Sequence, residues 1–180
     1  ESMSGDSMEF DDVVRKRRSI RRYTDEDVSQ EDIDEILRAA FYSPSASNRR
    51  PWHFIVVRDK EKRKELGKTH KYASMAAHSP VVIVVCADEE EANRWIEDAS
   101  IAAEHMHLKA EELGLGSCWI QVRSDEDYSR EEHVSDLLDI PENIRVLCLL
   151  SIGHPDEEKS EHTDEKIEKG RIHYETFGSR

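Results

Sequence analysis

The stretch "PVVIVVCA", residues 80–87, determines how this chain folds. Seven apolar residues follow Pro80 in succession, and Asp88 ends the run. Strands that are apolar at every position are typical of the centre of a sheet, whereas a strand with one solvated face alternates apolar and polar residues. We therefore predict that this stretch is a central strand buried on both of its faces.

Three other stretches have the composition of core strands, and helical patterns alternate with them along the chain. The strand candidates are "WHFIVV" (52–57), "SCWIQV" (117–122) and "RVLCLLSIG" (145–153). All three are rich in β-branched, aromatic or Leu residues. The alternation predicts a mixture of helices and strands around the central strand.

Four helices are predicted around these strands. They cover about residues 29–41, 60–67, 90–113 and 129–138. Ser29 with Asp32, and Ser129 with Glu132, have the spacing of a capping box, which marks the first turn of a helix. Gly114 follows the long third helix, at the position where a left-handed residue commonly ends a helix.

The composition predicts one acidic domain. The chain has 180 residues and a formal net charge of -14, which argues against binding nucleic acid or an anionic membrane by bulk electrostatics. Residues 1–7 are polar and contain no signal peptide, so we expect a disordered N-terminus or a remnant of expression. No apolar run reaches membrane-spanning length. The cysteines Cys86, Cys118 and Cys148 lie in apolar runs without C-x-x-C spacing, and we interpret them as buried thiols of a cytoplasmic protein.

Neither a classical nucleotide motif nor a metal site is predicted. Both G-x-G-x-x-G and G-x-x-x-x-G-K-[ST] are absent. Glu104-x-x-His107 matches half of a di-iron helix signature, but no second copy completes it. His105 and His107 point in directions about 200° apart on a helix, which makes a poor chelate. We interpret the histidines as ordinary surface or interface residues.

A basic cluster, residues 15–22 ("RKRRSIRR"), stands out in so acidic a chain. Six of its eight residues are basic. A phosphate monoester needs two or three converging donors, and Arg17, Arg18, Ser19 and Arg21 can supply them where a first helix ends. The same residues could form a solvated basic face or pair with neighbouring acids, and a nucleic-acid site is a third alternative.

Several motifs, taken in order, resemble those of the nitroreductase family of FMN-dependent oxidoreductases. The motifs are "RRSIRRY", "SPSASNRRPWHFIVV", "SPVVIVV", "EELGLGSCWI", "SIGHP" and "RIHYE", and they span about residues 10–177. The resemblance implies an α+β fold of three layers, with a mixed, mostly antiparallel sheet flanked by helices. It also implies an intertwined homodimer with two FMN sites at the interface. Residues 8–180 would form one FMN-binding domain whose C-terminal extension packs on the partner subunit.

The resemblance assigns the basic cluster to the FMN phosphate. Arg17 and Arg21 would bind the phosphate by their match to the family motif. Arg18 and Ser19 would reach the flavin pyrimidine edge and the chain between ribityl and phosphate. Arg171, near the C-terminus, would be an additional phosphate ligand.

Two other segments would contact the isoalloxazine ring of FMN. One comes from the other subunit and would line the ring with Pro44, Ser45, Ala46 and Asn48. The second would lie over the flavin near N5 and offer backbone donors, and it comprises Trp119, Ile120 and Gln121. Two positions depart from the common family pattern: Arg50 stands where Gln is frequent, and Gln121 where Gly is frequent.

The family's chemistry implies a ping-pong reaction. NADH or NADPH would give a hydride to flavin N5, and a nitroaromatic, quinone or flavin acceptor would then take its place. No side chain of the chain would be catalytic in its own right, because the flavin carries the chemistry. Two alternatives stay open: a specialised flavin enzyme such as a reductive dehalogenase or a dehydrogenase, and a non-redox nucleotide-binding or RNA-binding module that uses residues 15–22.

Overall fold

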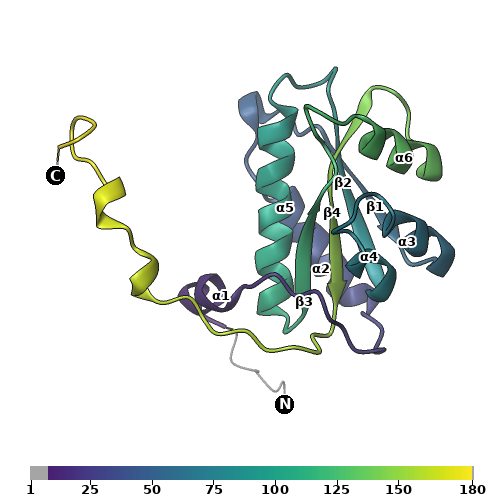
Figure 1. Ribbon diagram of the computed structural model, residues 1–180. Helices are drawn as coiled ribbons and strands as arrows, with labels where there is room; N and C mark the ends of the chain where they lie inside the picture. The colour runs from purple at the N-terminus through teal and green to yellow at the C-terminus, as the bar shows by residue number, and fades with distance from the viewer. Residues whose placement is uncertain (1–7, 180) are drawn as a thin grey trace, which may run out of the picture.

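A four-stranded antiparallel sheet lies at the centre of the computed structural model, which describes residues 8–179 (Figure 1). The strands are β1 (Trp52–Val57), β2 (Val81–Asp88), β3 (Gly116–Gln121) and β4 (Ile144–Gly153), in the order β1-β2-β4-β3. All three strand pairs are antiparallel. The predicted strands are therefore confirmed, and β2 has a neighbour on each side. Residues 1–7, for which the sequence predicts a disordered end or an expression remnant, lie outside the described residues.

Within residues 8–179, six α-helices and three short 3-10 turns accompany the sheet. The helices are α1 (Phe10–Lys16), α2 (Gln30–Phe41), α3 (Lys60–Leu66), α4 (Met75–His78), α5 (Trp95–Glu112) and α6 (Ser129–Leu138). The 3-10 turns are η1 (Ala46–Asn48), η2 (Asp164–Lys166) and η3 (Lys169–Arg171). As predicted, the Ser29 hydroxyl accepts a hydrogen bond from Asp32 N at 3.1 Å at the start of α2.

The helices cover both faces of the sheet, as an all-apolar central strand requires. Successive residues of β2 point to opposite faces because side chains alternate along a strand. Val81, Ile83 and Val85 pack in the core cluster that contains the buried residues of α2 and α5. Val82, Val84 and Cys86 pack in a second cluster with residues of α3, α4 and α6. Figure 1 shows α5 on one side of the sheet and α3, α4 and α6 on the other, which confirms the three-layer α+β fold.

The end of α5 forms the predicted glycine-terminated turn. Gly114 has φ +77°, in the left-handed region. Leu115 N donates to Ala110 O at 2.8 Å and Gly114 N donates to Glu111 O at 2.9 Å, the two hydrogen bonds of a Schellman motif. This turn reverses the chain directly into β3.

One predicted helix start and one predicted helix cap are wrong. The long helix was expected from about Glu90, but α5 begins at Trp95. Asp88 instead begins a single turn, in which its side chain accepts from Glu90 N at 2.9 Å and its carbonyl oxygen accepts from Ala92 N at 3.3 Å, and this turn is not continued into the helix.

The second correction concerns the capping box at α6. Ser129 is the first helical residue rather than the cap, and Tyr128 occupies the cap position without a side-chain hydrogen bond. Ser129 N donates to Asp127 Oδ1 at 3.1 Å, and the Ser129 hydroxyl faces the same oxygen. Asp127 therefore takes the role that the sequence assigned to Ser129.

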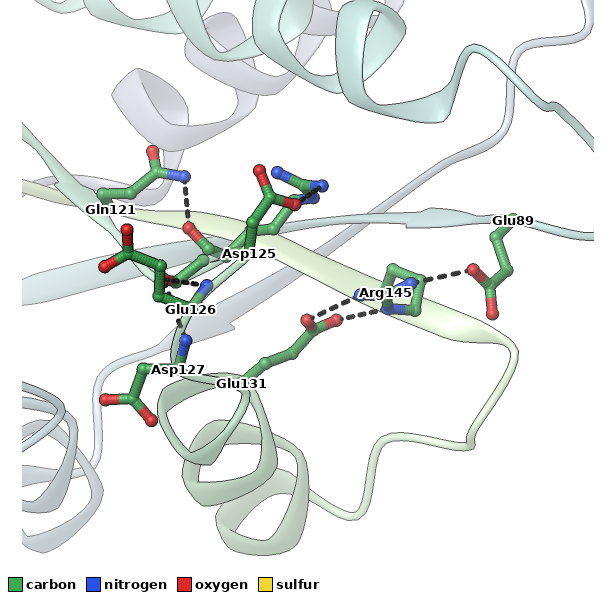
Figure 2. A network of polar contacts seen from close by, with 9 residues as sticks. Glu89, Gln121, Asp125, Glu126, Asp127, Glu131 and Arg145 are labelled. Carbon is green, nitrogen blue, oxygen red and sulfur yellow. Dashed lines mark hydrogen bonds and ion pairs between the residues drawn. The ribbon is translucent and has the colours of Figure 1, made fainter.

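A buried ion pair joins α6 to β4 (Figure 2). Glu131 is only 2% exposed, and its carboxylate accepts two hydrogen bonds from Arg145, at 2.7 and 2.9 Å. Glu89 accepts a third bond from Arg145 at 2.9 Å, and Val146 N donates to Glu131 at 2.9 Å. Bidentate geometry and a backbone donor compensate the cost of burying the Glu131 charge.

The segments at the two ends of the chain meet beside α1. Ser19 forms an isolated parallel bridge with Ser117 of β3, outside the four strands, whose pairs are all antiparallel rather than mixed. Thr24 N donates to His154 O at 2.9 Å, and His162 N donates to Arg15 O at 2.9 Å. The residues after β4 therefore run along the segment that follows α1.

Beyond residue 163 the chain extends away from the three layers (Figure 1). Its apolar side chains are open to solvent in the single chain, with Tyr174 64% exposed and Phe177 93% exposed. Packing of this segment on a partner subunit stays a prediction. None of the helices within residues 8–179 has both the length and the apolar character needed to cross a bilayer.

Candidate functional site

Arg17 lies at the centre of the candidate site, at the residue where α1 ends. Its Nη1 lies 3.2 Å from His107 Nε2, and its Nη2 lies 3.5 Å from His162 Nε2. The carboxylate of Glu104 is farther, with 3.8 Å between its Oε1 and Arg17 Nε. Imidazole nitrogens therefore make the hydrogen-bond contacts of the guanidinium, and Glu104 is its longer ion-pair partner.

His107 is a buried member of this site, 3% exposed on the inner face of α5. A guanidinium can only donate, so His107 Nε2 is the acceptor and Nδ1 carries the proton. Nδ1 then donates to the Ser117 hydroxyl on β3. Burial, with a smaller effect from the nearby Arg17 charge, lowers the pKa of His107 from 6.5 to about 4. The imidazole is therefore neutral at neutral pH.

The interpretation of all histidines as ordinary surface or interface residues is wrong for His107. Its spacing on the helix is compatible with the buried face, and neighbours such as Ala103 and Met106 are fully buried. What the sequence could not show is that Arg17, 90 residues away, and Ser117, on the strand that follows α5, lie against its two ring nitrogens.

Three other arginines of residues 15–22 have different partners. Arg15 forms ion pairs with Asp11 at 3.0 Å and with Glu161 at 2.7 Å, so pairing with neighbouring acids is the correct alternative for this residue. Arg18 donates to the carbonyl oxygen of Ser160. The side chain of Arg21 is exposed and has no ion-pair partner within residues 8–179, while its backbone N donates to Glu157 Oε1 at 2.8 Å.

Ser19 and the outer edge of β3 lie beside these arginines. Ile20 N donates to Ser117 O at 2.9 Å, and His70 Nε2 lies 2.8 Å from Gln121 O, both on the side of β3 away from β4. Because backbone groups of alternate residues point to the same side of a strand, the Trp119 N–H faces this side as well. The edge therefore offers a backbone donor between the two contacts.

Gln121 gives the end of this edge a defined side-chain arrangement. Its Oε1 accepts from the Trp119 indole Nε1 at 2.8 Å, and its Nε2 donates to Arg123 O at 2.8 Å. Ile120, between them, is buried in the core beneath α6. The departure from the more common Gly thus fixes the Trp119 ring by a hydrogen bond that glycine cannot make.

The loop that contains Pro44, Ser45, Ala46 and Asn48 is anchored on α5 and exposed on its outer side. Ala46 N donates to Asp98 Oδ1 at 2.8 Å, and Asp98 is only 2% exposed. Arg50 N donates to Ser45 Oγ at 3.0 Å.

The same loop has an unusual backbone. Ser47, Asn48 and Arg50 have φ of 52°, 51° and 53°, in the left-handed region that side chains other than glycine rarely adopt. Arg50 also stacks over Trp52, with its Cζ 5.4 Å from the ring centroid. The loop conformation is therefore fixed by contacts that a composition-based loop prediction does not contain.

The structure brings only part of the predicted site together within one chain. Arg17, Arg18, Ser19 and Arg21 lie close to β3, whereas the loop is attached to α5 at Asp98. His107 follows Asp98 by nine residues, roughly 13 Å along the helix axis. Arg171 lies in η3 of the extended segment, where it pairs with Glu168. Sharing of one ligand by these residues through a second copy of the chain stays a prediction.

Comparison with known proteins identifies the family. The sequence model of the nitroreductase family matches residues 14–71 and 67–154. The chain belongs to the nitroreductase family. A protein of Archaeoglobus fulgidus, provisionally named NADH dehydrogenase/NAD(P)H nitroreductase, is 42% identical over 173 residues, which cover 92% of this chain and 97% of the relative.

Two other nitroreductase relatives carry FMN in their names. The FMN reductase [NAD(P)H] of Bacillus subtilis is 32% identical over 160 residues, covering 77% of this chain and 62% of the relative. The solved structure of an FMN-dependent nitroreductase from Clostridium difficile superposes with a TM-score of 0.87 at 42% identity. That superposition covers 92% of this chain and 98% of the other, so the fold agrees over nearly the whole length.

Proposed function

We propose that this chain is an FMN-dependent oxidoreductase that takes a hydride from NADH or NADPH and reduces nitroaromatic, quinone or flavin acceptors. The observation that carries the proposal is Arg17, a partly buried arginine oriented by a neutral imidazole in a chain that belongs to the nitroreductase family. Family membership favours an enzyme over the non-redox nucleotide-binding or RNA-binding module.

The residues near Arg17 fit the phosphate of FMN. A phosphate monoester is dianionic at neutral pH, so its site needs cations that are not already neutralised. The one carboxylate at ion-pair distance from Arg17 among the described residues is Glu104 at 3.8 Å, which is too far for a hydrogen bond, and the Arg21 side chain is exposed. Arg17 and Arg21 would bind the phosphate, and the Ser19 hydroxyl would donate to it. Arg171 from the extended segment would be a further phosphate ligand.

The flavin ring would lie along the outer edge of β3. When bound, FMN supplies the redox chemistry by accepting a hydride at N5 and passing electrons to the acceptor. The chain orients it: Trp119, Ile120 and Gln121 would lie near N5 with the Trp119 N–H as donor. Arg18 would lie near the pyrimidine edge, where a cation stabilises negative charge on the reduced ring.

The site would be completed by a second subunit. In the proposed homodimer, Pro44, Ser45, Ala46 and Asn48 of one subunit line the ring bound by the arginines of the other. The exposed outer face of this loop and the exposed apolar side chains of residues 167–177 support this arrangement. Both substrates would use the same space above the ring in turn, because the sequence contains neither glycine-rich motif that would indicate a separate nucleotide site.

Binding of three flavins to the apoprotein tests the proposal. FMN should bind more tightly than riboflavin, which lacks the phosphate. Arg17→Ala should lower FMN affinity by roughly 10-fold or more, because a charge-assisted hydrogen bond contributes about 1.5–3 kcal/mol. Arg22→Ala is the matched control, since Arg22 is an exposed neighbour in the same cluster. FAD as the preferred ligand, or no flavin binding, would refute the proposal.

Mixed dimers test the shared site. Arg17→Ala subunits that are refolded together with Asn48→Ala subunits should regain one intact FMN site per heterodimer. Each variant alone should have two impaired sites. A monomer that binds one FMN with wild-type affinity would contradict the two-subunit site.

A further inference from the structure

The orientation of Arg17 depends on a chain of hydrogen bonds through the protein interior. An arginine side chain has many rotamers, and fixing it for a ligand costs conformational entropy unless the fold has already ordered it. Here the guanidinium contacts His107 on α5, and His107 contacts Ser117 on β3. Two elements of the rigid core therefore set the position of a side chain that follows α1.

The chemical nature of His107 matters as much as its position. A carboxylate at this place would orient Arg17 equally well, but it would cancel the positive charge that attracts a phosphate. A neutral imidazole accepts the same hydrogen bond and leaves the charge in place. Ser117 accepts from Nδ1–H and so keeps Nε2 free as an acceptor.

The other groups around Arg17 are consistent with this division of roles. Glu104 Oε1 is 3.8 Å from Arg17 Nε, an ion-pair distance that is too long for a hydrogen bond, so this carboxylate balances part of the charge without orienting the guanidinium. Burial raises the pKa of Glu104, and the Arg17 charge only partly offsets that effect. His162 lies 3.5 Å from Nη2 and belongs to the segment that crosses α1 after β4. Of these neighbours, His107 makes the shortest contact with Arg17.

We propose that His107 is a positioning residue for cofactor binding: together with Ser117 it orients the Arg17 guanidinium toward the FMN phosphate without neutralising it. The inference rests on the proposed function, since it assumes that Arg17 binds the phosphate. It assigns a role to a histidine that contacts no reacting atom.

The test measures binding of FMN and riboflavin to apoprotein variants. His107→Leu removes the acceptor and should lower FMN affinity about 10-fold while riboflavin affinity stays the same. His107→Gln has an amide oxygen that can accept from Arg17 and should keep FMN affinity within about 3-fold of the wild type. His105→Leu is the matched control on the same helix, because the His105 ring contacts Ala39 O of α2 at 3.0 Å instead.

The ratio of the two affinities separates the outcomes. Equal losses for FMN and riboflavin in His107→Leu would show a general structural role and overturn the inference, and so would unchanged FMN affinity. If His107→Leu does not fold, Ser117→Ala replaces it and should weaken FMN but not riboflavin. A wild-type protein that binds neither flavin would instead refute the proposed function itself.

Discussion

The free energy of unfolding should depend on pH through His107, and the size of that dependence follows from the structure. Burial lowers the pKa of His107 from 6.5 to about 4 in the folded state. Between these pH values the unfolded chain binds a proton that the folded protein does not. The contribution of neutral His107 to the free energy of unfolding is therefore complete above about pH 6.5, decreases as the pH falls, and is lost below about pH 4. A pKa difference of this size corresponds to about 3 kcal/mol.

Urea unfolding at several pH values checks this prediction. The variant His107→Gln cannot titrate, so the difference in unfolding free energy between wild type and variant should change by about 3 kcal/mol from about pH 7 to pH 4. The other titrating groups are common to both proteins and largely cancel in that difference. Both proteins need the same concentration, because dimerisation makes the apparent stability depend on concentration. Parallel profiles would show that His107 is protonated, or solvated, in the folded protein.

Three other predictions concern the α6 ion pair, the loop anchor and turnover. Glu131→Ala should lower the unfolding free energy by about 3 kcal/mol, because Arg145 loses its buried partner. The exposed control Glu132→Ala should change the unfolding free energy by less than about 0.5 kcal/mol. Equal effects of the two variants in denaturant unfolding would contradict this prediction. Asp98→Ala removes the acceptor of the Ala46 amide and should speed tryptic cleavage after Arg49 in the same loop. Asp98→Asn keeps an acceptor oxygen and should be cleaved at the wild-type rate. Identical cleavage rates for all three proteins would show that Asp98 does not anchor the loop. Steady-state plots at several acceptor concentrations should be parallel, whereas intersecting lines would indicate a ternary complex and a second substrate site.

The core of the fold could be predicted because its signals are local. The run 81–87 is apolar at every position, and the structure buries all seven residues. The Ser29 cap and the Gly114 turn depend on neighbours within a few residues, which a sequence displays directly. The start of α5 and the cap of α6 were wrong because the turn after Asp88 and the Asp127 side chain are local alternatives that the acidic composition of these segments does not distinguish.

The candidate site was predictable only where a motif carried it. The basic cluster identified Arg17, but its partners His107 and Glu104 lie about 90 residues later in the sequence. The spacing of Glu104 and His107 indicates only a helix. Neighbouring residues in the sequence do not distinguish a buried histidine that orients an arginine from a buried histidine that only fills space in the core. The contact between Asp98 and the loop could not be predicted either, because its partner Ala46 is 52 residues away in the sequence. Contacts of this kind are set by the packing of α5 against two distant segments.

Anaerobic reduction of the FMN-loaded protein tests the central claim most directly. The wild-type apoprotein is loaded with FMN, freed of excess flavin and mixed with NADH or NADPH in the absence of oxygen. The account predicts that at least one of the two nicotinamides bleaches the oxidised-flavin absorbance with one equivalent per bound FMN, and that a quinone or nitroaromatic restores it. A protein that binds FMN but is reduced by neither nicotinamide would contradict the account.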